Sequence, residues 1–461
     1  MERELSEIHT VRDAVHGVYS SYVRAKEYVV GRPDREVRRP KWTKQLLREL
    51  GSPDEATFNV AVTGSKGKGS HSIFLACMLE RMGLRVGLFT GPHLVDFMER
   101  FRLDGRVMPE DTFVSLTKRA LLVTESFELN PDEYCGPVGI LAAVGARWFT
   151  DERADVCVFE CGRGALHDDV NQVRHQGAVM TPVFMEHVSQ LGPTLADIGV
   201  EKAGVITSDT KFVIAHPQAR EVSRTLMQRA HVAEASLSTL GSDFDFAIDP
   251  IDDSESCILT LREHTEPQVK LVFPTAYASM ARNAAVSLRA AVEVWKQLKD
   301  RDAAPSQIDL RDIVLPGRLH VVRRRPFTLV DGTIHADSVP LVLDFLESLM
   351  RRNVLKPTRI GVVLGLPSDK DGAGVIGRLA RVADWFIVAR AHNPTLKFSD
   401  EWYTLAKTMG LDVTPVANIE EAGPLADGRL SGDDVLLVLG TQSFVADSLV
   451  YYGADSRSIW R

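Results

Sequence analysis

Short apolar runs alternate along this chain with longer segments in which apolar residues recur at helical spacing. The clearest alternation begins with the apolar, β-branched run Phe58–Thr63, which ends at Gly64. A glycine-rich turn follows, then apolar residues at helical spacing over Ser70–Met82 and a second short run at Val86–Phe89. The segment therefore predicts a strand, a loop, a helix and a strand.

The same alternation continues to the end of the chain. Helical patterns are expected over 1–50 and at Gly139–Phe149, Met280–Val294, Val339–Met350, Gly374–Val382 and Glu401–Met409. Strand patterns are expected at Phe212–Ala215, Cys257–Leu261, Val269–Phe273, Thr328–Val330, Arg359–Leu364, Trp385–Ala389 and Val435–Leu439. Strands that alternate with helices predict an α/β fold with mostly parallel sheets. We predict a larger domain over 1–310, with 212–275 at its edge, a linker near 300–307, and a smaller domain over 311–461.

Composition narrows the class of protein. A chain of 461 residues is too long for one core. Its 54 basic and 62 acidic residues give a net charge of −8, which offers no electrostatic footprint for nucleic acid or an anionic membrane. Met1–Arg12 lacks the apolar stretch of a signal peptide, so we expect a cytoplasmic protein. The five cysteines lie mostly in apolar runs, which favours reduced core thiols over disulfides or zinc.

The glycine-rich turn between the first strand and helix predicts a phosphate site. The N-terminus of a helix directs backbone N–H groups and a partial positive charge at its ligand. Lys68 would bring a point charge to the phosphates of ATP, and the Ser70 hydroxyl could bind magnesium. The alternative is a plain glycine-rich turn. The nucleotide-binding residues expected here are Gly64, Ser65, Lys66, Gly67, Lys68, Gly69 and Ser70.

Two further segments place charged groups where open α/β sheets bind ligands. A buried strand pattern stops at Glu160 beside glycines, and such a carboxylate suits magnesium, although a solvated strand-end acid is the alternative. Another strand pattern ends at His187, and a helix begins at Thr194 with Lys202 in its last turn. Taken alone, a lysine there is usually a partner of the helix dipole.

The spacing of the phosphate loop departs from the standard Walker A pattern. Its sequence, G-S-K-G-K-G-S, resembles instead the phosphate loop of the Mur ligase superfamily. Its G-K-G-S resembles the folylpolyglutamate and dihydrofolate synthase branch. Further matches lie in the same order over about residues 15–455. They comprise His93, Leu94, Glu99, Arg100, Glu160, Gly162, Gly164, Asp168, Asn171, the E-H…L-G-x-T…E-K-A-G run at 186–204, P-G-R at 316–318, D-G at 331–332 and S-D-K-D at 368–371.

The resemblance implies a P-loop NTPase-like Mur ligase central domain followed by a smaller Rossmann-like α/β domain, with ATP between them. It implies an ADP-forming acid–amino-acid ligase, with Lys68, His187 and Lys202 as catalytic residues. Magnesium would be held by Ser70, Glu160 and His187, and Lys202 would be carbamylated. Asn283 would lie near adenine, while Arg318 and Asp331 would reach the nucleotide from the second domain.

Several positions depart from the family pattern, namely Gly91, Ala165–His167, Met280 and Thr333–Ala336. Three hypotheses therefore stay open: a folylpolyglutamate or dihydrofolate synthase that adds glutamate, the same ligation on a different acceptor, and a nucleotide-binding partner protein without catalysis. Under the first two, the partners are a small carboxylic acid and an amino acid, without nucleic acid or membrane. We expect an anionic acceptor drawn by Arg163 and Arg100.

Overall fold

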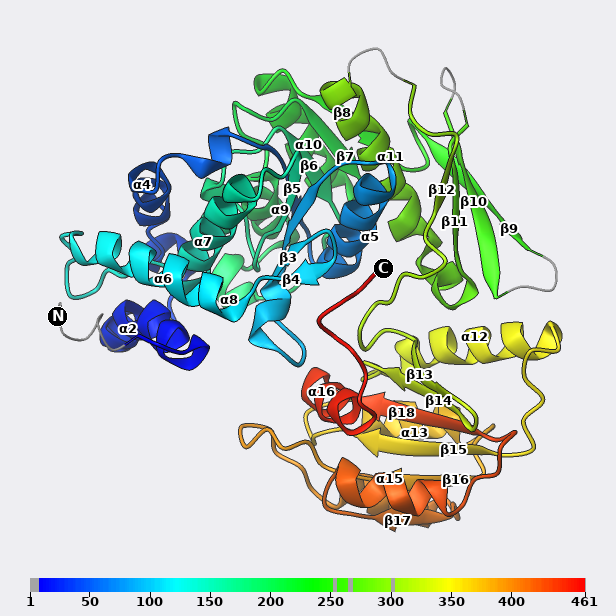
Figure 1. Ribbon diagram of the computed structural model, residues 1–461. Coiled ribbons are helices and arrows are strands. Elements are labelled where there is room, and N and C mark those ends of the chain that lie inside the picture. The colour runs from blue at the N-terminus through cyan, green and yellow to red at the C-terminus, as the bar shows by residue number, and fades with distance from the viewer. Residues whose placement is uncertain (1–7, 252–254, 264–267, 300–302, 461) are drawn as a thin grey trace.

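The computed structural model describes residues 8–251, 255–263, 268–299 and 303–460. Its helices are α2 (Val11–Val29), α3 (Asp34–Val37), α4 (Lys41–Glu49), α5 (Lys68–Arg81), α6 (Glu110–Glu125), α7 (Pro137–Asp151), α8 (Val188–Leu191), α9 (Leu195–Ala203), α10 (Arg220–Val232), α11 (Ala281–Lys299), α12 (Val339–Arg351), α13 (Gly372–Leu379), α14 (Glu401–Thr408), α15 (Ile419–Asp427) and α16 (Gln442–Tyr451). The described strands form three sheets (Figure 1).

The largest sheet has eight strands in the order β4-β3-β2-β5-β1-β6-β7-β8. Its strands are β1 (Phe58–Thr63), β2 (Val86–Phe89), β3 (Phe101–Leu103), β4 (Arg106–Val107), β5 (Val156–Glu160), β6 (Gly177–Met180), β7 (Phe212–Ala215) and β8 (Ser236–Thr239). All neighbours from β2 to β8 pair in parallel, whereas β3 and β4 are antiparallel. The carboxyl ends of the parallel strands therefore meet at one edge of the sheet.

Helices cover both faces of this sheet, which explains why its strands are continuously apolar. Val60 and Val62 of β1 pack in the cluster that contains α5 and α11. Cys157 and Phe159 of β5 face the opposite way, into a cluster with α2, α4, α6 and α7. Successive side chains of a strand point to opposite faces, so a strand buried on both sides shows no polar alternation.

The second sheet was not foreseen as a separate unit. Its four strands, in the order β12-β11-β10-β9, are β9 (Asp245–Pro250), β10 (Ser256–Arg262), β11 (Lys270–Pro274) and β12 (Gln307–Asp309). Within 212–275, β7 and β8 join the main sheet at its edge, whereas β9, β10 and β11 belong to the second sheet. The placement of this segment at the edge of the first domain stays a prediction. Residues 300–302 of the predicted linker lie outside the described residues, and its end forms part of β12.

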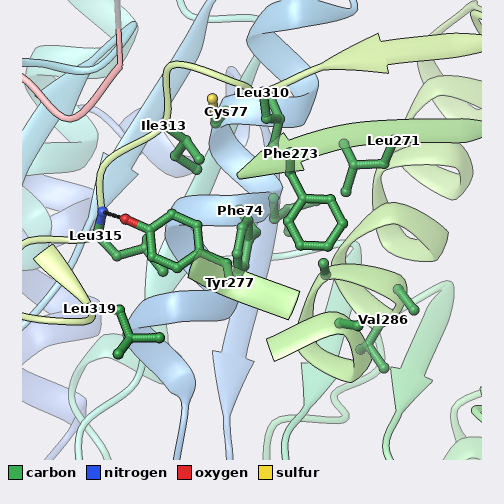
Figure 2. Close-up of a cluster of buried hydrophobic side chains, with 14 of the residues drawn as sticks. Phe74, Cys77, Leu271, Phe273, Tyr277, Val286, Leu310, Ile313, Leu315 and Leu319 are labelled. Atoms are coloured by element: carbon green, nitrogen blue, oxygen red, sulfur yellow. Dashed lines mark hydrogen bonds between the residues drawn. The ribbon is translucent and has the colours of Figure 1, made fainter. Parts of the chain in front are cut away.

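A buried cluster attaches this second sheet to the helix that follows the glycine-rich loop. Figure 2 shows Phe273 of β11 and Tyr277 beside Phe74 of α5, and the Tyr277 ring stands at 81° to the Phe74 ring. The Tyr277 hydroxyl accepts a hydrogen bond of 2.8 Å from the N–H of Leu315, on the segment that leads to the third sheet. The apolar contacts therefore hold the second sheet on α5.

The third sheet has six strands in the order β13-β14-β18-β15-β16-β17. They are β13 (His320–Arg324), β14 (Phe327–Asp331), β15 (Ile360–Gly365), β16 (Trp385–Val388), β17 (Val413–Pro415) and β18 (Val435–Gly440). All pairs from β14 to β17 are parallel, and β13 is antiparallel at the edge. This sheet, with its helices, is the second α/β unit that the alternation of strands and helices after residue 311 predicts. The domain boundary at 310/311 stays a prediction.

Residues near the C-terminal end of the described chain return to the first sheet, where the red segment in Figure 1 lies beside β4. The guanidinium of Arg102 donates to the carbonyl of Ser456 at 2.7 Å, and Arg457 forms ion pairs with Asp96 and Glu110. These contacts tie the two α/β units together. Among the helices that the structure describes, none has the length and apolar character needed to cross a membrane.

Asp434 fixes the start of the third sheet. Its buried carboxylate accepts hydrogen bonds from Ser431, from the Thr358 hydroxyl and from the backbone N–H of Arg359. Burial alone would raise the pKa of this carboxyl, but the hydrogen bonds from Ser431 and Thr358 outweigh it and lower the pKa to about 2. The ionised form of Asp434 is therefore part of the folded state.

We expect Asp434→Asn to lower the free energy of unfolding by about 2 kcal/mol at neutral pH, which is the value of such a pKa depression. Because the folded pKa lies below the ordinary value, this stabilisation is complete above about pH 4 and disappears as the pH falls towards 2. Urea unfolding of both proteins across this range measures the difference. Asp433→Asn is the control, since its exposed ion pair with Arg325 should contribute almost nothing.

Candidate active site

Five parallel strands deliver polar residues to one edge of the main sheet. Thr63 leads into the glycine-rich loop, Phe89 into Thr90 and Gly91, and Met180 into Thr181, while β5 ends at Glu160 and β7 precedes His216. Strand order places β1 between β5 and β6. The loop, Glu160 and the segment that carries His187 are neighbours for this reason.

The conformation of the loop requires glycine at two positions. Gly64 has φ of 134°, and a Cβ there would lie 2.8 Å from the carbonyl oxygen of Thr181. Gly67 has φ of 88° and is the N-cap of α5, so the helix begins at Lys68 rather than at the predicted Ser70. Ser70 lies in the first turn, whose N–H groups have no partners within the helix and are available to an anion.

The remaining side chains of the loop hold it or face outward. The Ser65 hydroxyl donates to the carbonyl of Phe184 at 3.2 Å, and its N–H donates to the carbonyl of Pro182 at 2.9 Å. The Lys68 ammonium donates to the carbonyl of Gly64 at 3.1 Å, which folds its chain back over the loop. Lys66 is exposed, and its charge helps to lower the pKa of Asp331 in the third sheet.

Glu160 is a buried carboxylate directly beside the start of α5. A Cβ at Gly69 would lie 3.6 Å from its Oε2, and the same oxygen accepts a hydrogen bond of 3.1 Å from the N–H of Gly91. Burial raises the pKa of Glu160 to about 7, against the opposing effects of Gly91, Lys68 and Arg100. Within the described residues no lysine or arginine nitrogen lies within 4.0 Å of it. A divalent cation would therefore supply a missing counter-charge.

The strand predicted to end at His187 stops earlier, because β6 ends at Met180, and His187 lies in the loop that follows, at the N-cap of α8. The His187 side chain is half exposed, and its Nε2 lies 4.0 Å from Oε2 of Glu186. In the described part of the chain, no three His, Cys, Asp or Glu side chains form a metal site. The predicted set of Ser70, Glu160 and His187 would thus need water or nucleotide oxygens to complete it.

Lys202 is fully buried in the last turn of α9. Its ammonium donates to the carbonyl oxygens of Gly64 and Arg163, each at 2.8 Å, and pairs with Oε1 of Glu186 at 2.8 Å. Burial lowers the pKa of Lys202, and the Glu186 carboxylate opposes that effect. One side chain thus joins the glycine-rich loop, the loop after β5 and the loop after β6.

A buried histidine pair, which the sequence reading did not single out, supports the same loop. His71 Nδ1 lies 2.7 Å from the carbonyl of Gly67, and its Nε2 lies 2.8 Å from Nε2 of His216. A carbonyl can only accept, so His71 is protonated at Nδ1 and accepts at Nε2 from His216. Burial lowers the pKa of His71 to about 4 and of His216 to about 3. In the sequence, the only sign of this pair was that His71 directly follows Ser70 of the loop.

We expect His216→Leu to destabilise the protein by about 1 to 3 kcal/mol, because it leaves the buried Nε2 of His71 without a donor. Urea unfolding measures the loss. The double variant His71→Leu/His216→Leu removes both polar partners and should recover much of the stability. An equal or larger loss in the double variant would show that the hydrogen bond is not the cause.

The arginines expected to draw the acceptor differ in what they contact. Arg163 forms a two-point ion pair with buried Asp34, at 2.8 Å and 2.5 Å, so its charge is already neutralised. Arg100 is buried, donates to Nδ1 of His93 at 3.1 Å, and has no carboxylate within 4.0 Å among the described residues. Of the two, only Arg100 keeps an uncompensated charge, and it lies near Glu160.

The third sheet contributes the other predicted nucleotide residues. The Asp331 carboxylate, at the end of β14, accepts from the N–H of Leu319 at 2.9 Å and from the Thr333 hydroxyl at 2.5 Å. Burial raises the pKa of Asp331, while Thr333, Leu319, Arg318 and Lys66 oppose that effect. The charges of Arg318 and of the glycine-rich loop thus both act on Asp331.

Asn283, predicted to lie near adenine, and His335, in a segment that departs from the family pattern, differ in their surroundings. Asn283 lies in the first turn of α11, and its Nδ2 would be 3.4 Å from a Cβ at Gly67. Asn283 therefore lies against the loop, and its place near adenine stays a prediction. His335 is exposed and begins a short turn that leads into α12.

Comparison with known proteins extends these observations to the whole chain. No family model matches. The chain is 28% identical over 429 residues to a Haloferax volcanii protein named probable bifunctional folylpolyglutamate synthase/dihydropteroate synthase, covering 90% of this chain and 48% of that one. Against the dihydrofolate synthase/folylpolyglutamate synthase of Bacillus subtilis it is 25% identical over 413 residues, covering 88% and 92%. The Escherichia coli protein of the same name is 27% identical over 406 residues, covering 87% and 88%.

Solved structures show the same fold. The apo form of L. casei FPGS superposes with a TM-score of 0.73 at 21% identity, over 89% of this chain and 94% of that one. Mycobacterium tuberculosis folylpolyglutamate synthase complexed with ADP and AMPPCP gives a TM-score of 0.71 at 21% identity, over 95% and 99%. The predicted fold class is confirmed. The chain spans about half the length of the Haloferax protein and about nine tenths of the bacterial ones.

Proposed function

We propose that this chain, a divergent member of the folylpolyglutamate and dihydrofolate synthase branch of the Mur ligase superfamily, is an ATP-dependent ligase that joins a carboxylic acid to an amino acid such as glutamate. A carboxylate oxygen of the acid attacks the γ-phosphorus of ATP, which gives an acyl phosphate and ADP. The amine then attacks the acyl carbon, phosphate leaves, and an amide remains. Two smaller steps replace the direct acylation of an unreactive carboxylate.

The observation that carries this proposal is the buried, uncompensated Glu160 beside the helix N-terminus that follows the glycine-rich loop. A neighbouring structure holds ADP and AMPPCP, and another holds AMPPNP and a Mn ion. We infer ATP with a divalent ion, magnesium in the cell, held by Ser70, Glu160 and His187. When bound, such an ion neutralises charge on the phosphoryl group in transfer.

The chain's own residues bind and orient the nucleotide. The N–H groups at the start of α5 would hold the phosphates, and Lys68 would exchange its contact with the Gly64 carbonyl for the γ-phosphate. Asn283 is placed for the base, since it lies against Gly67. Arg318 and Asp331 would contact the nucleotide from the side of the third sheet, since the charges of Arg318 and of Lys66 in the loop both act on Asp331. Catalysis of this kind depends mainly on positioning and charge.

The resemblance also predicts a carbamate on Lys202, which stays a prediction. A carbamate carries a negative charge and offers acceptor oxygens. The polar atoms nearest to the Lys202 nitrogen are two carbonyl oxygens and one carboxylate oxygen, all of them acceptors. These surroundings fit an ammonium, and no step of the proposed reaction passes through a carbamate.

Two kinds of carboxylic acid are candidates for the acceptor: a folate and a different acid. Relatives act on folates by name, and a neighbouring structure is a complex with AMPPCP and folate. In this chain, however, the loop after β5 is occupied internally: Arg163 pairs with Asp34, and His167 pairs with Glu201 at 2.5 Å. Loops of this kind set specificity on an α/β scaffold, so a different carboxylic acid is the second candidate.

Phosphate release from ATP across a panel of acids and amines tests the proposal. Dihydropteroate or tetrahydrofolate with glutamate should give saturable ADP formation at micromolar concentration if the acceptor is a folate. Turnover with another acid, and none with either folate, would establish the second candidate. Absence of any acid-dependent ADP formation, in protein shown to bind ATP, would contradict ligase activity.

A further inference from the structure

A cavity of about 520 Å³ lies at the edge of the main sheet where its parallel strands begin. Its walls come mainly from the turn Pro53–Glu55 before β1, from residues 171–175 before β6, from residues 206–209 before β7, and from α4 and α10. The glycine-rich loop follows β1 and therefore lies at the opposite edge of the sheet. A cavity of this volume is large enough for a small metabolite, and it is separate from the candidate active site.

Asn171, in the wall of the cavity, has a buried oxygen without a donor. Its Nδ2 donates to the carbonyl of Gly204 at 3.0 Å, which fixes the orientation of the amide. Its Oδ1 is buried and has no hydrogen-bond partner within the described chain, and the residue as a whole is 9% exposed. Buried acceptors are normally satisfied. A hydroxyl or N–H group of a molecule in the cavity would satisfy this one.

His175, in the same wall, is 2% exposed and has a carbonyl oxygen at each ring nitrogen. Nδ1 lies 2.9 Å from the carbonyl of Val173, and Nε2 lies 2.7 Å from the carbonyl of Val205. A carbonyl can only accept, so both contacts are hydrogen bonds only when both ring nitrogens carry a proton. The geometry therefore favours a cationic imidazolium, which forms no ion pair with a described residue.

Three further cations line the cavity without a counter-charge. Lys44 and Arg48 lie one turn apart on α4, and Arg229 approaches from α10. None of the three forms an ion pair or a side-chain hydrogen bond with any residue that the structure describes, whereas Arg174 in the same wall pairs with Asp209 at 2.9 Å. Several uncompensated positive charges around one cavity attract an anion.

The acidic side chains of the wall are partly engaged and limit the kind of anion. Asp54 accepts a hydrogen bond of 2.8 Å from the N–H of Arg174, and Asp209 is in the ion pair with Arg174. Glu55 is exposed. Carboxylate oxygens and the Oδ1 of Asn171 accept from hydroxyl groups, while the planar donor fork of arginine suits a phosphate. The wall therefore combines groups for a phosphate with groups for hydroxyls.

We propose that this cavity is a second ligand site, which binds a small phosphate ester that also carries hydroxyl groups. Arg48 and Arg229 pair with the phosphate, and the Oδ1 of Asn171 accepts from a hydroxyl. Binding here does not depend on the proposed ligation, because none of the residues assigned to that reaction lines the cavity.

Calorimetry on the full chain with ribose 5-phosphate tests this proposal. We expect saturable binding with a Kd below about 1 mM. Arg48→Ala/Arg229→Ala should weaken it by about tenfold or more, because hydrogen bonds to charged groups are among the strongest. Both side chains lack ion pairs, so the variant should fold. Arg224→Ala is the matched control, since Arg224 is an exposed arginine of α10 outside the cavity wall, and it should bind as the wild type does.

Two comparisons separate this site from the glycine-rich loop and from unspecific binding. Lys68→Ala should leave the binding of ribose 5-phosphate unchanged. Loss of binding in Lys68→Ala, with none in Arg48→Ala/Arg229→Ala, would place the phosphate at the loop and overturn the proposal. Ribose should not bind, and inorganic phosphate should bind more weakly than the ester; equal affinity of either would contradict the paired recognition. No saturable binding of ribose 5-phosphate or glycerol 3-phosphate would also overturn it.

Discussion

Replacing Lys68 with alanine is expected to lower the rate of ATP-dependent ligation by at least about a hundredfold, the scale of losing one preorganised donor at a developing charge. Lys68 is the first residue of α5, and its ammonium already lies over the loop, 3.1 Å from the Gly64 carbonyl. Its charge also acts on Glu160. The loss should appear in kcat, measured as acid-dependent ADP formation.

Two controls accompany this prediction. Lys270→Ala removes an exposed lysine from β11, far from the loop in sequence and in sheet, and should leave the rate unchanged. Lys68→Arg keeps the charge in a different shape, so it should retain part of the activity. Full turnover in Lys68→Ala would exclude the glycine-rich loop as the phosphate site.

Lys202→Met is expected to have the largest effect on stability, with a loss of about 3 kcal/mol in the free energy of unfolding. The variant leaves the Glu186 carboxylate, the Gly64 carbonyl and the Arg163 carbonyl without their shared donor. Because the glycine-rich loop loses an anchor, ligation should also fall by about a hundredfold, as misplacement of reacting groups by about 1 Å can cause. Urea unfolding and ADP formation measure the two effects.

A double variant separates charge from packing. Lys202→Met/Glu186→Leu removes both members of the pair, so much of the lost stability should return even though activity does not. If the double variant is as unstable as Lys202→Met alone, the contacts to the two backbone carbonyls are the main contribution. Such a result would assign the stability of this region to the hydrogen bonds of Lys202 and not to its ion pair.

Local patterns in the sequence were enough to predict the first strand, the loop and the helix that follows it. Gly64 and Gly67 have the positive φ values that glycine accommodates, and Lys68 lies beside the loop as expected. Glu160 was predicted to lie at the carboxyl edge because an apolar strand ends there, and it does. These features depend on residues close in sequence, so their pattern is visible in one segment.

Contacts between distant segments were not predictable in the same way. The second sheet arises because β11 and α11 pack on α5, and its strand patterns alone fit the edge of the main sheet equally well. Arg163 was expected to meet an acceptor, yet it pairs with Asp34, which lies on a helix far earlier in the chain. Apolar periodicity does not encode which partner a charged side chain will find.

The sequence by itself determined the order of strands and helices, the glycine-rich loop and the ligase resemblance, since each rests on spacing within a short stretch. Only the tertiary structure decided that Glu186 reaches Lys202, that His71 meets His216, and that His187 lies in a loop beyond the end of β6. Each of these depends on strand order and on the length of individual strands, because parallel neighbours bring together residues from distant segments.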